Sequence, residues 1–309
     1  GTDPRALSYL VPKSRIFHIF ADNVDFRAAG FLKQEMLSRG GDVAVTKHVI
    51  DGKTEKSDIL IMATHSQLRN LQEKLKAMDC WGLKEFREKL AGIMKAVNIH
   101  EWQMISPSGH TINFSLDTKL MAIINLTPDS FFAESRTDEA NILSRAEKFL
   151  SDGAYILDVG AESTRPGAES VSLSEEIDRL VPALRILRKE FPDAIISVDT
   201  YKPEVAKISA NEGADIINDI SGFEFDAEIP ETISKLNVPY ILSHIKSDSE
   251  PFKNLRSEII SYFRNKLNIL ENAGVNLKNI ILDPGLGFGK NPPENFYIIK
   301  NIDFFRFII

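Results

Sequence analysis

From residue 120 to the end of the chain, short apolar runs alternate with longer stretches whose apolar residues recur at helical spacing. The apolar runs end near residues 125, 160, 199, 218, 244 and 283, and two of the helical stretches cover 138–152 and 174–190. Regular alternation of strands and helices is typical of parallel strands. We therefore expect an α/β fold, a (β/α)8 TIM-barrel-type domain of which about six βα units are present.

Polar side chains stand at the ends of these strands. They are Asn125, Asp199, Asn218, His244 and Asp283. In a barrel, the carboxyl ends of the strands form one rim, which is where the active site lies. An open doubly wound sheet is the alternative, but it gathers its ligand groups at one switch point and fits this distribution less well.

The first hundred residues have a pattern of their own. Strand-like runs cover 15–20, 43–45 and 58–62, and helical stretches cover 26–39, 67–76 and 83–97. We expect a small α/β domain of unknown role over residues 1–98, and the barrel domain, incomplete at its C-terminal end, over 99–309. Ser66 beside His65 is interpreted as a helix cap next to a surface histidine rather than as a catalytic pair. Between the two patterns, residues 102–105 and 110–116 flank a Pro-Ser-Gly turn and predict a β-hairpin.

Composition narrows the class of protein. The chain has 309 residues, of which 43% are hydrophobic and 26% charged, as in ordinary globular proteins. A net charge of -7 and a pI of about 5.5 argue against a nucleic-acid partner. No apolar run reaches the length of a membrane span, so no membrane partner is expected. The single cysteine, Cys80, suits a reducing compartment such as the cytoplasm. Because the chain begins Gly1-Thr2 without methionine, we expect its start to be trimmed.

The most informative segment is residues 283–290, which read DPGLGFGK directly after an apolar run at 279–282. This order places a carboxylate at a strand end, and the glycines behind it let the backbone approach a flat ligand closely. A phosphate-binding P-loop is excluded because it needs glycine at 284 and Ser or Thr at 291. The dinucleotide pattern fails because the glycines stand at 285, 287 and 289. Taken alone, the segment could also be a plain glycine-rich turn.

The segment does not stand alone, because further motifs precede it in order. They read NLTPDSF at 125–131, DVGAESTRPG at 158–167, DT at 199–200 and ND at 218–219. Together these motifs resemble the dihydropteroate synthase family, over roughly residues 100–309. The resemblance implies a cytoplasmic transferase of folate biosynthesis that forms a homodimer and is a target of sulfonamides. Its reaction condenses 6-hydroxymethyl-7,8-dihydropterin diphosphate with para-aminobenzoate to give 7,8-dihydropteroate and pyrophosphate. The hairpin would close the bottom of the barrel.

The resemblance also implies which residues bind the pterin. They are Asp199, Asn218 and Asp283, with Phe288 and Ser243 shaping the pocket. A pterin edge presents N–H donors beside acceptors, and a carboxylate and an amide suit such an edge well. For Asp199 a plain helix cap before Lys202 stays open as an alternative.

The remaining implied roles concern the leaving group and the second substrate. Asn125 would help to bind Mg²⁺ and pyrophosphate, since a phosphate-bearing substrate and oxygen ligands suit that ion; a mere turn residue is the alternative. The catalytic set implied is Asn125, Asp199 and Asp283, and no protein nucleophile is needed. The para-aminobenzoate site would be formed by two loops, through Phe131, Thr164, Arg165 and Pro166.

Some positions depart from the family. Residues 132–135 read FAES where Ser-Asp-Gly-Gly is common, and Ser243 stands where the fifth strand usually has methionine. The family's Ser-Arg-Lys-Ser and Arg-x-His motifs do not occur. We therefore expect the natural protein to continue by two more βα units or its end to pack against another chain. We also expect the apolar residues of 296–309 to lack cover, and this chain alone to bind pterin weakly and turn over little.

Two other functions stay open. One is a folate-dependent methyltransferase of the same pterin-binding superfamily, and the other is a non-catalytic pterin-binding fragment. The segments at 127–131 and 163–167 favour the synthase because they suit a second, aminobenzoate site.

Overall fold

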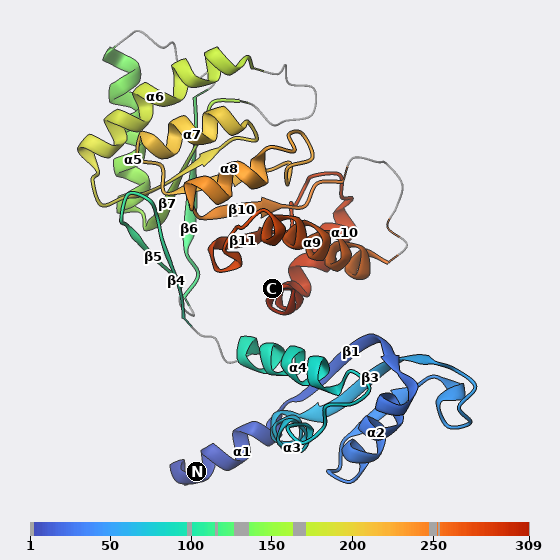
Figure 1. Ribbon diagram of the computed structural model, residues 1–309. Coiled ribbons are helices and arrows are strands. Elements are labelled where there is room, and N and C mark those ends of the chain that lie inside the picture. The colour runs from blue at the N-terminus through green and yellow to red at the C-terminus, as the bar shows by residue number, and fades with distance from the viewer. Residues whose placement is uncertain are drawn as a thin grey trace. The chain divides into compact units, whose positions relative to one another are not determined.

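The computed structural model describes residues 3–97, 101–114, 117–126, 136–162, 171–246, 252 and 254–308. The chain divides into two compact units, Gly1–Ile99 and His100–Ile309, and each is described here by itself (Figure 1). No helix in these described ranges is long and apolar enough to cross a membrane.

The first unit is a three-stranded antiparallel sheet in the order β1-β3-β2 with helices packed on it. Its helices and strands are α1 (Leu7–Ser14), β1 (Ile16–Asp25), α2 (Phe26–Leu37), β2 (Asp42–Val45), β3 (Lys56–Thr64), α3 (His65–Leu75) and α4 (Leu83–Val97). The interpretation of Ser66 as a helix cap is wrong. Thr64 caps α3 in a capping box with Gln67, and Ser66 lies inside the first turn.

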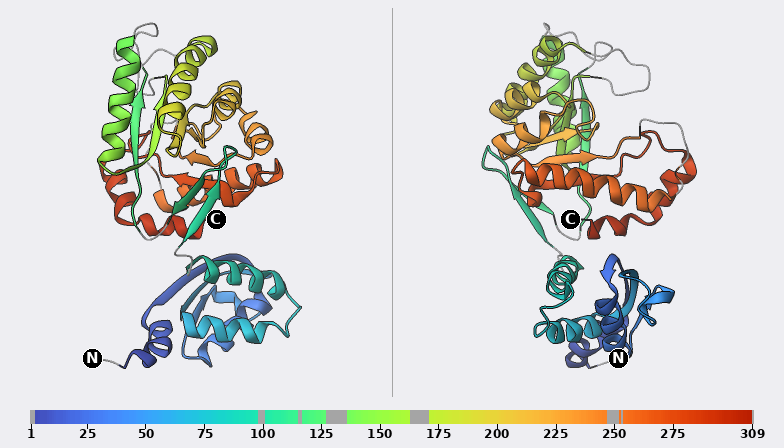
Figure 2. Two further views of the ribbon diagram at one scale, coloured as in Figure 1. Left: turned by 90° about the vertical axis from the view of Figure 1, so that its left-hand side faces the viewer. Right: turned by 45° about the vertical axis from the view of Figure 1, so that its right-hand side comes forward.

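The second unit contains a six-stranded parallel sheet in the order β11-β10-β9-β8-β7-β6, which confirms the predicted strands and their alternation with helices. In chain order its elements are β4 (Trp102–Ile105), β5 (Thr111–Phe114), β6 (Leu120–Asn125), α5 (Arg136–Ser151), β7 (Ala154–Gly160), α6 (Leu173–Glu190), β8 (Ile195–Asp199), α7 (Pro203–Asn211), β9 (Ile216–Asp219), α8 (Ile229–Leu236), β10 (Tyr240–Ser243), α9 (Leu255–Asn272), β11 (Ile280–Asp283) and α10 (Pro292–Lys300). Figure 2 shows the sheet curving with its helices on one side. The architecture is that of a partial (β/α) barrel.

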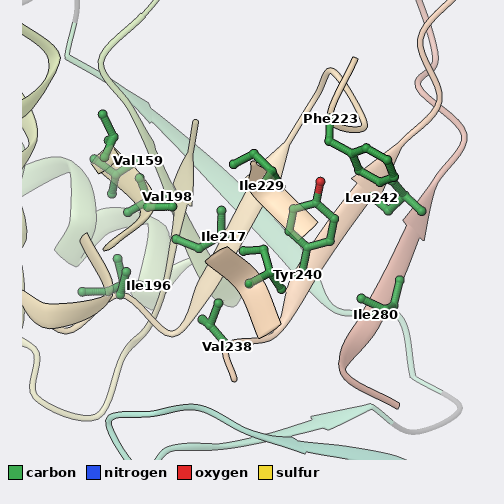
Figure 3. Close-up of a cluster of buried hydrophobic side chains, with 14 of the residues drawn as sticks. Val159, Ile196, Val198, Ile217, Phe223, Ile229, Val238, Tyr240, Leu242 and Ile280 are labelled. Carbon is green, nitrogen blue, oxygen red and sulfur yellow. The ribbon is translucent and has the colours of Figure 1, made fainter. Parts of the chain in front are cut away.

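The face of the sheet that meets the helices is largely apolar, and its buried Asp219 accepts a hydrogen bond from Tyr240 at 2.7 Å. Alternate residues of the strands pack there against α5 to α9 in one large cluster, and Tyr240 and Phe263 are its largest fully buried side chains. Figure 3 shows the part of this cluster around β8, β9 and β10. Burying a Leu, Ile or Phe side chain contributes about 1.5–3 kcal/mol each, so this face holds the unit together.

The opposite face changes character along the strands. At the amino ends it is apolar and packs against the β4–β5 hairpin; this second cluster comprises Met104, Ile112, Ile156, Ile195, Ile216 and Ile241. Since side chains alternate between the faces, the residues two and four positions further along each strand lie on the same face. There the sequence turns polar, so only the carboxyl ends of the strands present hydrogen-bonding groups on this side.

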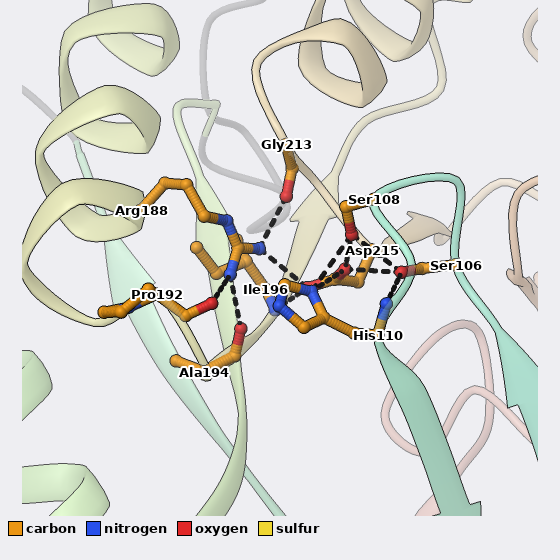
Figure 4. Close-up of polar contacts among 9 residues, drawn as sticks. All are labelled: Ser106, Ser108, His110, Arg188, Pro192, Ala194, Ile196, Gly213 and Asp215. Atoms are coloured by element: carbon orange, nitrogen blue, oxygen red, sulfur yellow. Dashed lines mark hydrogen bonds and ion pairs between the residues drawn. The ribbon is translucent and has the colours of Figure 1, made fainter.

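A buried carboxylate fastens the hairpin to the bottom of the sheet (Figure 4). Asp215, whose side chain is fully buried, accepts hydrogen bonds from Ser106 at 2.7 Å and from Ser108. It also pairs with His110 Nδ1 at 2.8 Å and with Arg188 Nη2 at 2.8 Å. Because three partners from the hairpin and one from α6 bind the same carboxylate, the hairpin is held against the amino ends of the strands.

The end of the chain is better packed than the sequence predicted. Ile298, Phe304 and Ile308 are buried in the large apolar cluster, so the expectation that they lack cover is wrong. Phe296 and Ile299 on α10 are exposed, at 72% and 54%. The difference follows the 3.6-residue period of the helix, which turns Ile298 inward and its neighbours outward.

Candidate active site

Four residues at the carboxyl ends of adjacent strands form one row across the sheet. In the parallel register Asn125 is opposite Gly160, Gly160 is opposite Asp199, and Asp199 is opposite Asn218. Gly160 leaves a gap in this row. A Cβ placed there would lie 3.6 Å from Asp199 Oδ2 and 3.8 Å from Asn125 Oδ1. The missing side chain therefore opens a space that the side chains of Asn125 and Asp199 both border.

Asn218 is held in one orientation by a residue that sequence reasoning did not single out. Its Nδ2 donates to Asp158 Oδ2 at 3.2 Å, and both side chains are buried. This bond uses the donor end of the amide and leaves Oδ1 as an acceptor. Asp158 could have been found from the alternation of β7, because it lies two residues before Gly160 and so on the same face.

Two buried carboxyl groups at this end of the sheet, those of Asp158 and Asp199, have raised pKa values. Burial chiefly, and next the charges of Asp158 and Asp219, raise the pKa of Asp199 well above its usual value. Burial also raises the pKa of Asp158, and the charge of Asp283 adds to the effect. Within the described residues, Asp158 Oδ1 has no hydrogen-bond partner. With Asn218 Oδ1, the site offers several acceptor oxygens, and a ligand with several N–H donors would suit them.

Asp283 ends β11 beside Ser243 at the end of β10. The Ser243 hydroxyl donates to Asp283 Oδ2 at 3.0 Å, and the backbone N–H of Gly285 donates to Oδ1 at 3.0 Å. Each carboxylate oxygen keeps a further lone pair. Asp283 is thus fixed in orientation and can still accept hydrogen bonds from a ligand.

Two of the glycines after Asp283 are required by close backbone contact. Gly285 has φ +61°, and a Cβ on it would lie 2.1 Å from the carbonyl oxygen of His244. Gly289 has φ +68°, and its Cβ would lie 2.2 Å from the carbonyl oxygen of Lys246. The loop therefore packs its backbone directly on the segment that follows β10. The predicted close approach of these glycines to a flat ligand stays a prediction. Phe288 lies half-buried in the same loop.

His244 does not join the polar row as an acid or base. It is buried, and its ring meets Tyr262 edge-on with the centroids 4.5 Å apart. Burial chiefly, and next the charge of Lys290, lowers the pKa of His244 to about 3. The imidazole is therefore neutral near pH 7.

Asp199 is not a helix cap. Lys202 is the N-cap residue of α7, and its backbone N–H is accepted by Thr200 Oγ1 at 3.2 Å. Strand alternation instead places Asp199 on the inner face with Ser197. The structure thus brings Asn125, Asp199 and Asn218 into one row, with Ser243 and Asp283 paired on the two strands beyond it.

The residues predicted for the second substrate, Phe131, Thr164, Arg165 and Pro166, lie outside the described residues. The residues on either side of segment 163–170 are described and share one partner. Lys202 Nζ donates to Glu162 Oε2 and to the carbonyl oxygen of Val171, each at 2.7 Å. No group of three or more His, Cys, Asp or Glu side chains that could hold a metal ion occurs among the described residues.

Comparison with known proteins agrees with this geometry. The profile of the family described as pterin binding enzyme matches residues 121–309. A dihydropteroate synthase of Clostridium beijerinckii is 41% identical over 192 residues, covering 62% of this chain and 71% of the relative. A probable bifunctional folylpolyglutamate synthase/dihydropteroate synthase of Halobacterium salinarum is 34% identical over 306 residues, covering 94% of this chain and 35% of the relative.

Solved structures show the same likeness. A dihydropteroate synthase of Coxiella burnetii in complex with pteroic acid superimposes with a TM-score of 0.58 at 34% identity, covering 66% of this chain and 74% of that one. With the sheet, the row of polar strand ends and the glycine loop in place, these matches show that the chain belongs to the pterin-binding enzyme family, and within it to the dihydropteroate synthases.

Proposed function

We propose that the inner face at the strand ends binds the pterin substrate of dihydropteroate synthesis. The observation that carries the proposal is the set of acceptors at the ends of β8, β9 and β11, which are Asp199, Asn218 and Asp283. A pterin ring presents its amino and ring N–H groups along one edge, which matches acceptors without competing donors. A hydrogen bond to a charged group contributes about 1.5–3 kcal/mol, so bonds to the carboxylates of Asp199 and Asp283, with a weaker one to the Asn218 amide, support specific binding.

The same carboxylates support the chemical step. When the C–O bond to the diphosphate breaks, positive charge develops on the pterin methylene and spreads into the ring. Carboxylates of Asp158, Asp199 and Asp283 face this space, and fixed negative charge stabilises a cation in a poorly solvated site. The arylamine nitrogen of para-aminobenzoate then forms the new C–N bond and loses its proton, so the protein supplies no nucleophile.

Asn125 is the residue we propose for the metal-bound leaving group. Its Oδ1 borders the gap at Gly160, and an amide oxygen is a suitable Mg²⁺ ligand. Mg²⁺ in such sites is held mostly by water and substrate phosphates, which fits a single protein donor. When bound, the ion would neutralise charge on the departing pyrophosphate. Asn125 itself would orient the diphosphate at the end of β6.

Three further assignments stay predictions. Phe131, Thr164, Arg165 and Pro166 would bind para-aminobenzoate, and Arg165→Ala should then raise the apparent constant for that substrate more than for the pterin. A homodimer and a cytoplasmic location are expected from the family. Sedimentation analysis of the complete protein tests whether it forms a homodimer.

Pyrophosphate release tests the function directly. The complete protein is supplied with the pterin diphosphate, Mg²⁺ and para-aminobenzoate, and dihydropteroate and pyrophosphate should appear in equal amounts. Binding of methyl-tetrahydrofolate in preference to the pterin diphosphate, with no pyrophosphate released, would favour the methyltransferase alternative. A protein that binds the pterin and forms no product would match the non-catalytic alternative.

A further inference from the structure

One buried side chain joins the glycine loop to the neighbouring strand end. Lys290 is 7% exposed, and its Nζ donates to three carbonyl oxygens. They belong to His244 at 3.0 Å, Gly285 at 2.9 Å and Phe288 at 3.1 Å. An ammonium group has three N–H donors. All three are therefore used within the protein, and none is left for a ligand.

The three carbonyls come from two separate segments. His244 follows β10, whereas Gly285 and Phe288 lie in the loop after β11. The His244 carbonyl oxygen that accepts from Lys290 is also the atom that a Cβ on Gly285 would meet at 2.1 Å. Glycine and lysine thus act together: the missing side chain lets the two backbones meet, and the ammonium bonds them there.

Loop position and carboxylate position are linked. The backbone N–H of Gly285 donates to Asp283 Oδ1 at 3.0 Å, while the Gly285 carbonyl accepts from Lys290. A shift of Gly285 would disturb both bonds, because its N–H makes one and its carbonyl makes the other. The conformation of the loop therefore decides how Asp283 is presented to the ligand.

Burying an ammonium is unfavourable for folding alone. Burial lowers the pKa of Lys290 to about 8, and the charges of Asp283 and Glu294 act in the opposite direction. His244 and Lys246 are the other titratable groups at this contact, and His244 is neutral near pH 7. A hydrophobic side chain would fill the space with a smaller desolvation cost, but it could not bond three carbonyls.

We propose that Lys290 is a positioning residue for the pterin site: it fixes the backbone of 285–288 and, through Gly285, the carboxylate of Asp283. This role rests on the proposed pterin binding by Asp283. Because the three donors of Lys290 are used within the protein, we expect it to affect pterin affinity only through the position of Asp283.

The test measures binding of 6-hydroxymethyl-7,8-dihydropterin diphosphate by calorimetry to four variants of the complete protein. Lys290→Met should fold and weaken binding at least tenfold, and Lys290→Arg, which keeps charge and donors, should recover most of the loss. Lys300→Met removes an exposed lysine from the adjacent helix α10 and should bind as the unaltered protein does. Asp283→Asn reports on the proposed function itself.

The outcomes separate the two claims. If Asp283→Asn loses binding while Lys290→Met keeps it, the positioning role is wrong and the proposed function stands. If both variants bind normally, the pterin site is wrong, and the inference falls with it.

A pH series keeps the test decisive if Lys290→Met does not fold. Affinity of the unaltered protein should fall above about pH 8, where the lysine loses its third donor, relative to Lys290→Arg at the same pH. Parallel curves for these two proteins would overturn the proposal, because changes in the ligand's own charge affect both equally.

Discussion

The hydroxyl of Ser243 donates a hydrogen bond of 3.0 Å to Asp283 Oδ2 across two adjacent strands. A methionine, which the family resemblance implies at this position, could not donate such a bond. The serine is 1% exposed, so the bond forms away from solvent and holds the carboxylate in one orientation. In this chain, therefore, orientation of the proposed pterin ligand Asp283 depends on a side chain as well as on the backbone of Gly285.

We expect Ser243→Ala to weaken pterin binding by about 1–2 kcal/mol, because a bond to a charged group is lost in a buried site. Titration calorimetry with the pterin diphosphate measures the change. Ser243→Thr, which keeps a hydroxyl, is the matched control. Equal affinity of the alanine variant and the unaltered protein would show that the backbone alone orients Asp283.

Asp158→Ala should weaken pterin binding by about 1–3 kcal/mol although Asp158 is proposed to act through Asn218. Without the acceptor for its Nδ2, the Asn218 amide can turn and present a donor where the pterin also has donors. Asp193→Ala, at an exposed carboxylate on the same unit, should leave affinity unchanged. An unaltered dissociation constant for Asp158→Ala would contradict the positioning of Asn218.

Asp199→Asn should weaken pterin binding without lowering the stability of the protein. The pKa of Asp199 is raised in the folded protein, so the folded state holds a proton that the unfolded chain releases above the ordinary aspartate pKa. The free energy of unfolding of the unaltered protein therefore falls as the pH rises from the ordinary aspartate pKa towards the raised pKa of Asp199. The asparagine variant has no proton to lose there and lacks this fall. Urea unfolding at pH 7 should show a variant at least as stable, with pterin binding weakened by about 2 kcal/mol. The stability of the variant minus that of the unaltered protein should be larger at pH 7 than at pH 4. A smaller difference at pH 7 would contradict a raised pKa for Asp199.

Arg188→Ala should destabilise the second unit by about 3–5 kcal/mol, because it removes one partner of the fully buried carboxylate Asp215. Hydrogen bonds from Ser108, the Ile196 backbone and His110 outweigh burial and lower the pKa of Asp215. The network therefore stabilises the fold above the ordinary aspartate pKa and loses its effect in more acid solution. Arg185→Ala, at an exposed ion pair on the same helix, should destabilise the unit far less, because solvent screens that pair. Similar unfolding free energies for both variants would argue against the closing role of the network.

The strands and the polar ends of the sheet could be predicted because their signals are local. Apolar runs followed by Asn125, Asn218 or Asp283 need no knowledge of distant partners. The N-cap role of Thr64 could also be predicted, since its spacing to Gln67 is that of a capping box. The interpretation of Ser66 as the cap overlooked this spacing.

The remaining contacts depend on residues far apart in the chain. Lys290 bonds to backbone carbonyls, and any residue type supplies a carbonyl, so nothing near residue 244 indicates its partner. Asp215 likewise meets Ser106 and His110 more than a hundred residues away. The sequence predicts no cover for Ile298 and Phe304, because the packing of α10 and of the turn after it on the large cluster is a tertiary feature.

The most direct test of the account is the affinity of Asp283→Asn for 6-hydroxymethyl-7,8-dihydropterin diphosphate, measured by calorimetry alongside a thermal unfolding curve. Asparagine keeps the size of the side chain but replaces one acceptor by a donor. We predict a folded variant whose binding is weaker by about 2 kcal/mol or more, which is a factor of roughly thirty. A folded variant with the affinity of the unaltered protein would contradict the assignment of the strand ends as the pterin site.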